Sequence, residues 1–185
     1  MMKGRNEMKK CLLVLFIIFE MSSIQAKADL LLEPYLNILI SGKDSETSNT
    51  YSGNELGARI GWSNLGLTLG LDVLGLGVIK VKGTTGSVDL KPSGIGVFIS
   101  YTFPILVRGY LSYFPTYTGK VDSINFESTG SGSKIGLQYT GLPFVYLGLE
   151  LESISNKSRV LNGSKADYDR SLSFTHFTVS APFSF

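Results

Sequence analysis

Side chains that bind metals or form disulfides are almost absent from this chain of 185 residues, which has one cysteine, Cys11, and one histidine, His176. A single cysteine forms no internal disulfide. One histidine without further cysteines does not supply the ligand set of the usual zinc sites. The sequence therefore predicts no disulfide, no metal site and no cofactor.

Long hydrophobic runs are also scarce. The first is residues 11–19, which follows the basic residues Lys3, Arg5, Lys9 and Lys10 and leads into small and polar residues up to Ala28. The run is too short to cross a bilayer as a helix. Its pattern is typical of a secretory signal peptide that is cleaved after Ala28 or Ala26, and the alternative is a buried core helix. We predict a signal peptide over 1–28 and one domain over 29–185.

The predicted domain has no excess of positive charge. Removing residues 1–28 takes away five of the seventeen basic residues and two of the fifteen acidic ones, which leaves twelve against thirteen. The basic isoelectric point therefore belongs to the precursor, and charge gives no reason to expect a nucleic-acid partner.

Apolar residues alternate with polar ones along residues 55–73. Leu56, Ala58, Ile60 and Trp62 alternate with Glu55, Gly57, Arg59 and Gly61, and after Ser63 and Asn64 the apolar residues move to odd positions, from Leu65 to Val73. This is the pattern of two strands joined by a two-residue turn, with one apolar face.

The same alternation predicts six further strands. They cover about 31–40, 94–101, 105–113, 134–139, 145–152 and the end of the chain, and four polar loops fall at 41–54, 76–93, 114–131 and 153–170. Leu172 and Phe174 have the wrong parity for the last strand, which a bulge or a projection above the bilayer would explain. Short turns alternating with long loops are typical of outer-membrane barrels.

The predicted apolar faces carry no Asp, Glu, Lys or Arg. If these faces meet lipid, the chain has to close into a barrel, because lipid cannot hydrogen-bond a free strand edge. We therefore predict an all-β, eight-stranded, antiparallel up-and-down transmembrane barrel in the outer membrane of a Gram-negative bacterium. A soluble sandwich or a lipocalin-like barrel that buries its apolar face is the alternative.

Two further patterns fit this barrel. Three predicted strands end in outward aromatic residues, Trp62, Tyr101 and Tyr139, which form an aromatic girdle at one membrane interface. Pro34 and Pro182 lie near the periplasmic rims of the first and last strands, where a missing backbone donor is tolerated.

The inward faces carry the charge. The predicted interior polar network is Arg59, Arg108 and Lys134 against Asp72, Glu150 and Glu152, with Glu33 and Glu55 nearer the rims. Opposite charges in a closed lumen are typical of a structural network, and counting back from the turn places Lys134 directly across from Glu150. Interior glycines such as Gly57 and Gly136 leave room for long side chains.

The chain resembles the OmpA-like family of small outer-membrane β-barrels. The resemblance rests on the signal peptide, Leu-Glu-Pro-Tyr at 32–35, Gly-Ala-Arg-Ile-Gly at 57–61 and the terminal aromatic residue. It implies the barrel fold and the outer-membrane location, and it says little about function. No periplasmic peptidoglycan-binding domain is expected.

Three functions are consistent with such a barrel. The first is a structural or surface-interaction role, in which loops with Tyr51, Tyr117, Phe126 and Tyr168 bind glycans, lipopolysaccharide or a protein. The second is a narrow channel, since eight strands leave no wide pore. The third is a lipid A deacylase built on His176 and Thr178, although their parity turns both side chains away from lipid. We expect no enzyme activity.

The end of the chain predicts how the barrel is assembled. An apolar residue stands at every second position of the last strand: Phe177, Val179, Ala181, Phe183 and Phe185. This pattern resembles the recognition signal that barrels present to their insertion machinery. The expected partners are that machinery and the outer-membrane lipids with lipopolysaccharide, and the barrel is expected to be a monomer.

Overall fold

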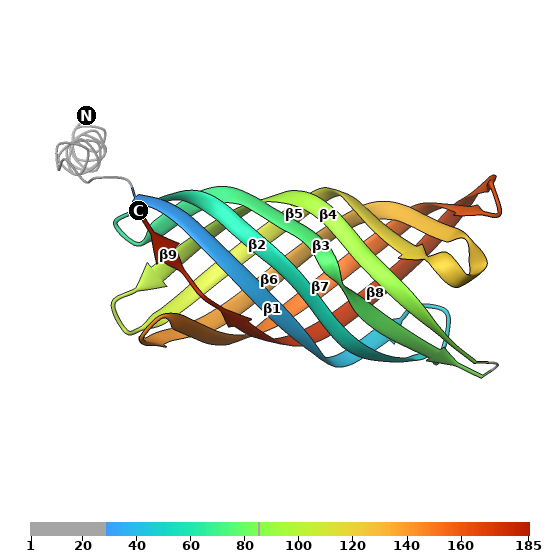
Figure 1. The fold of residues 1–185 in the computed structure, drawn as a ribbon, viewed down its shortest axis with the longest axis horizontal. Helices are drawn as coiled ribbons and strands as arrows, with labels where there is room; N and C mark the ends of the chain where they lie inside the picture. Colours follow the sequence, from blue (N-terminus) through green and yellow to red (C-terminus); the bar gives the residue numbers. More distant parts are fainter. Residues whose placement is uncertain (1–28, 85) are drawn as a thin grey trace, which may run out of the picture.

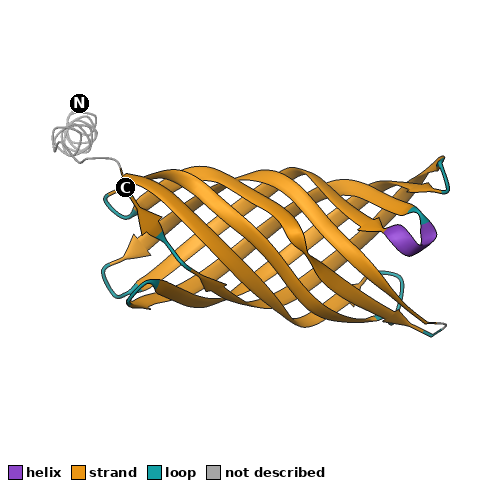
Figure 2. Ribbon diagram, viewed as in Figure 1, coloured by secondary structure: helices purple, strands orange, loops and turns teal. Residues whose placement is uncertain are grey.

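The computed structural model describes residues 29–84 and 86–185, so the predicted signal peptide lies outside the described residues. Nearly all of the described chain is β-strand (Figure 2). The strands are β1 (Asp29–Asp44), β2 (Thr50–Asn64), β3 (Leu67–Gly83), β4 (Gly86–Phe103), β5 (Val107–Val121), β6 (Phe126–Leu142), β7 (Val145–Leu161), β8 (Ser164–Ser180) and β9 (Phe183–Ser184). The described helix is η1 (Asp122–Ile124), and no helix of this part is long and apolar enough to cross a membrane.

Strands β1 to β8 close into a ring in which each strand is antiparallel to both of its neighbours, with β1 paired to β2 on one side and to β8 on the other (Figure 1). β9 continues the course of β8 along β1. The backbones of Leu30 and Phe185 bond to each other in both directions, so both ends of the described chain lie at one rim. The predicted eight-stranded antiparallel barrel is confirmed.

The first tight turn is two residues further along than the sequence indicated. Ser63 and Asn64 still belong to β2, where they face Thr68 and Leu67 of β3. The turn consists of Leu65 and Gly66, with φ angles of 50° and 82°. Positive φ at both positions matches the right-handed twist of a hairpin, and glycine adopts it without strain.

The four long loops predicted on the other rim are wrong. Each of those segments is mostly strand, so the hairpins extend to 15 to 18 residues per strand and the connections at their tips are short. A transmembrane strand needs only about 9 to 11 residues. The barrel therefore continues well beyond the apolar band, on the side away from the chain ends.

The polarity of the barrel wall inverts where this extension begins. On β7 the outward residues change from Leu149 and Leu151 to Ser153, while the inward residues change from Glu152 to Ile154. An outer wall that leaves lipid for water becomes polar, and the interior then takes the apolar residues. The segments predicted as loops are therefore mostly strands whose outward face is hydrophilic.

The inversion explains the parity of Leu172 and Phe174. Both are buried inside the barrel, and β8 pairs with β7 without interruption from Ser180 back to Arg170. Of the two explanations offered by the sequence, the projection above the bilayer is correct for β8. The bulge at this level lies in β1, between Leu39 and Ser41.

Apolar and aromatic side chains fill the lumen of the extension. Phe174 packs edge-on against Tyr51 with ring centroids 5.3 Å apart, and Phe114 packs against Tyr117 at 6.2 Å. We call this cluster the apolar plug. Its members are Leu39, Tyr51, Leu74, Ile79, Leu90, Phe114, Tyr117, Val121, Ile154, Leu172 and Phe174.

Pro34 and Pro182 meet at one interruption of the ring. The carbonyl of Pro34 accepts a bond from the amide of Ala181, so the proline nitrogen faces the break between β8 and β9. An antiparallel residue directs its N and O to the same neighbour. Both missing donors therefore fall where the ladder is already open.

The plug makes a testable distinction between two phenylalanines of β8. Phe174→Ala should lower the free energy of unfolding by about 3 to 5 kcal/mol, because it empties a packed interior site. Phe174 is 2% exposed, whereas Phe177 is 37% exposed on the outer wall. Denaturant unfolding in lipid vesicles, followed by tryptophan fluorescence, measures both variants. Phe177→Ala is the control, and an equal loss in the two variants would contradict the plug as a packed core.

Candidate functional site

A polar layer fills the lumen between the plug and the rim that carries the chain ends. All of its charged members are at most 2% exposed. They are Glu33, Glu55, Arg59, Asp72, Arg108, Lys134, Glu150, Glu152 and His176. All six residues of the predicted interior polar network lie in this layer.

Arg59 of β2 occupies the centre of the layer. Its guanidinium lies between two aromatic rings, 4.4 Å from the centroid of Tyr35 and 4.0 Å from that of Tyr110. Its nitrogens pair with three carboxylates: Glu33 at 3.2 Å, Asp72 at 3.3 Å and Glu150 at 3.1 Å. A planar guanidinium with five donors suits this arrangement, because its edges pair with the carboxylates while its two faces lie against the aromatic rings.

Two glycines make room for these rings. A Cβ on Gly57 would overlap the hydroxyl of Tyr35, and one on Gly136 would overlap the ring of Tyr110. The space that the interior glycines leave is thus filled by aromatic rings that hold Arg59.

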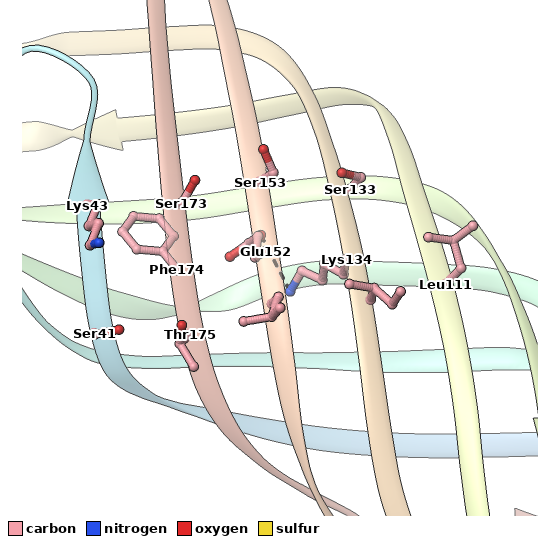
Figure 3. A pocket seen from close by; sticks show the side chains of 12 residues that line it. Ser41, Lys43, Leu111, Ser133, Lys134, Glu152, Ser153, Ser173, Phe174 and Thr175 are labelled. Carbon is pink, nitrogen blue, oxygen red and sulfur yellow. Dashed lines mark ion pairs between the residues drawn. The ribbon is translucent and has the colours of Figure 1, made fainter.

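Lys134 of β6 forms the second centre, nearer to the plug. Its ammonium lies 3.0 Å from Glu55, 3.3 Å from Glu150 and 3.6 Å from Glu152. The residue directly across from Lys134 is Glu152 and not Glu150, because Tyr139 faces Leu147 after an irregular turn. The predicted register is therefore wrong by two residues. The long side chain still reaches Glu150, and Figure 3 shows Lys134 and Glu152 on their neighbouring strands.

The two glutamates that the sequence placed nearer the rims belong to the same layer. Glu33 and Glu55 are fully buried and ion-paired, so five carboxylates face three permanent cations and His176. Neutral donors supply additional bonds to these carboxylates. They are Tyr35 and Ser112 to Asp72, at 2.8 and 2.6 Å, and Tyr110 and Asn37 to Glu150, both at 2.5 Å. The inward parity of these residues was visible in the sequence, but their partners were not.

His176 does not form a catalytic pair with Thr178. The His176 Nε2 atom lies 3.1 Å from Glu152, while the hydroxyl of Thr178 donates to the Asn37 side chain at 2.8 Å. His176 and Thr178 are both fully buried in the lumen, away from the lipid-facing wall. The geometry gives no support to the deacylase interpretation.

One histidine and two carboxylates do come together, which the sequence alone did not predict. Potential ligand atoms of Glu55, Glu152 and His176 lie within 4.8 Å of one another. The ammonium of Lys134 already lies within 3.6 Å of both carboxylates. A second cation there would be repelled, so this cluster is best described as part of the ion-pair network.

A depression of about 520 Å³ marks the level at which the outer wall changes from apolar to polar. Most of its lining residues face outward, among them Ser133, Ser153 and Ser173, which lie in register on three neighbouring strands (Figure 3). Leu151 and Ile135 form the apolar side of the same depression.

On the side of the plug away from the polar layer, the lumen opens to solvent as a hollow of about 350 Å³. We call this hollow the mouth cup. Phe126 and Tyr168, two of the predicted loop aromatics, line it with their rings 5.9 Å apart. Tyr51 and Tyr117 are instead 7% and 2% exposed and belong to the plug. The expectation that all four lie on flexible surface loops is therefore wrong.

A polar clamp holds the rim of the mouth cup. Arg170 donates to Asp44 at 2.8 Å, to Tyr168 at 2.6 Å and to Thr47 at 2.9 Å. Tyr51 donates to the same Asp44 carboxylate at 2.9 Å. Burial raises the pKa of the Tyr168 phenol, which therefore stays neutral at physiological pH.

The predicted girdle residues lie near the rim with the chain ends. Trp62, Tyr101 and Tyr139 are 66%, 42% and 47% exposed on the outer wall. Phe103 packs edge-on against Tyr101 with ring centroids 4.9 Å apart. A girdle of aromatic residues beside an apolar band is typical of a membrane interface.

Several solved bacterial proteins are similar to this structure. Neisserial surface protein A is 19% identical over 84% of this chain and 97% of its own, with a TM-score of 0.49. The N-terminal β-barrel domain of OprF from Pseudomonas aeruginosa is 13% identical over 85% and 100%, with a TM-score of 0.48. OprG from the same species is 10% identical over 85% and 97%, with a TM-score of 0.45.

No protein-family model matches the chain, and no curated protein matches it in sequence. The similar structures include outer-membrane proteins of the kind that the sequence resemblance predicted. The closed ring, the apolar outer band and the charged interior of this chain have the form that the sequence predicted for an outer-membrane barrel.

Arg59 tests how far the polar layer supports the fold. Arg59→Gln should lower the free energy of unfolding by about 3 to 5 kcal/mol, because it leaves buried carboxylates without their cation. Denaturant unfolding in lipid vesicles, followed by tryptophan fluorescence, measures this free energy. Lys91→Gln is the matched control, since Lys91 pairs with Asp122 on the solvent-exposed rim at 2.5 Å. A loss no larger than that of the control would contradict a cooperative buried network.

Proposed function

We propose that the protein is a closed, non-conducting and non-enzymatic outer-membrane barrel that acts through its extracellular end. The observation that carries this proposal is the position of the apolar plug directly above the polar layer. Phe114, Ile79 and Phe174 are at most 2% exposed within it. An ion that entered the lumen would have to leave water at the plug, at a cost of several kcal/mol.

The polar layer supports the same conclusion from below. Arg59 and Lys134 each contact three carboxylates, so the fixed charges are bound to one another across the lumen. A water-filled pore exposes its charged side chains, whereas the charged side chains of this layer are at most 2% exposed. The layer therefore acts as a structural cross-link between strands, and the narrow-channel alternative has no observation in its favour.

The extended strands give the extracellular end its role. They carry the mouth cup and its rim of Arg159, Arg170 and Asn49 on a rigid wall above the lipid. Binding residues are often found on connections that a rigid scaffold positions. We infer that the surface-interaction role belongs to this rim and cup.

Conductance tests the closed lumen. Wild-type protein in planar bilayers of phosphatidylcholine should give no single-channel steps, because the plug removes water from the lumen. The double variant Phe114→Ala and Phe174→Ala, which thins the plug, should raise the conductance above the bilayer background. Single-channel steps from the wild-type protein would overturn the proposal.

Assembly depends, we propose, on the alternating residues from Phe177 to Phe185 as a signal to the insertion machinery. Phe185→Ala keeps the backbone bonds to Leu30 but removes the aromatic ring, which is 75% exposed. It should lower the yield of heat-modifiable, folded protein in outer-membrane fractions more than Tyr101→Ala, which removes a comparable lipid-facing ring. Equal yields would make Phe185 an ordinary girdle residue.

A further inference from the structure

The mouth cup combines apolar walls with a cationic rim. Leu90 and Val121 of the plug form part of its lining, together with Phe126 and Leu161. Leu161 is 40% exposed and Ile124, also in the lining, is 47% exposed. These surfaces lie above the membrane, so in the structure they face water and not lipid. Covering them would be favourable, because apolar surface gains free energy when it is removed from water.

The two arginines of the rim differ in what they contact. Arg170 is held by the carboxylate of Asp44 and by Tyr168 and Thr47. Arg159 makes no ion pair with any residue that the structure describes, and its guanidinium lies over the ring of Tyr168 at 5.2 Å. Arg159 is also solvent-exposed, so its donors are available to a ligand.

We propose that the mouth cup binds a small amphipathic anion, with its carboxylate paired to Arg159 and its apolar tail against Phe126 and Leu161. This assignment rests on the proposed function, since it names the ligand class of the extracellular end. A volume of about 350 Å³ is at the lower end of the range for small-molecule sites. A guanidinium suits a carboxylate because it donates two parallel hydrogen bonds.

The position of the cup limits the size of the ligand. The plug closes the cup from below, so the tail has no path into the polar layer. The clamp around Arg170 fixes the loop of residues 45–49 at one side of the rim. The ligand therefore enters from the extracellular medium and returns to it, and the site serves capture and not transport.

The probe is 4-phenylbutyrate, whose neutral analogue 4-phenylbutanamide has the same tail. Binding is measured by calorimetry on the full barrel in phosphatidylcholine nanodiscs, with empty nanodiscs as the blank. We expect the acid to bind at least about tenfold more tightly than the amide, as for a hydrogen-bonded charge. Arg159→Gln should remove that preference and leave the amide unchanged, while Arg159→Lys should retain part of it.

Lys157→Gln is the matched control. Lys157 is an exposed cation two residues away on β7 that does not line the cup. Lys157→Gln should leave the affinities for the acid and for the amide unchanged. Leu161→Ser should weaken the binding of both, because it removes part of the apolar wall. Heat-modifiable mobility confirms that each variant is folded.

Two results would overturn the proposal: no binding above empty nanodiscs, or an acid preference that survives Arg159→Gln. Either result leaves the conductance experiment unaffected, so a failure of this ligand class is distinguishable from a failure of the closed-barrel function.

Discussion

The narrowness of an eight-stranded barrel is the constraint on which the rest of this structure depends. Such a lumen is just wide enough for side chains, so each inward charge has to find its partners among other side chains. Arg59 satisfies this condition through three carboxylates and two aromatic rings. Because these partners come from β1, β3, β5 and β7, one residue connects both halves of the ring.

The boundary between lipid and water organises the barrel along its axis. Below it, the outer wall is apolar and the lumen is charged; above it, the wall carries serines and the lumen holds the apolar plug. The strands themselves continue through the boundary, with β7 and β8 paired from Tyr146 to beyond Ser155. Only the solvent outside changes, and the side chains change with it. The plug and the mouth cup are both results of this inversion.

The features that follow from local alternation were predictable. The inward parity of Arg59, Arg108 and Lys134 appears in the sequence because a slip of one residue would place all three in lipid. The long loops were not predicted correctly, because polar outward residues such as Ser153 and Lys157 have the composition of loops once the wall leaves the membrane. Turn positions also failed, at Leu65 with Gly66 and after Tyr139, since hairpin register depends on backbone conformation.

The sequence by itself determined the fold class, the closed ring and the two faces of each strand, because a period of two residues and the cost of charge in lipid leave no other register. Only the tertiary structure decided which inward groups meet. Glu33 and Glu55 join the central network, Lys134 lies across from Glu152, and Arg159 is left without an ion pair among the described residues. Such contacts depend on strand register and side-chain reach across the lumen, which join residues up to 141 positions apart. No local pattern contains that information.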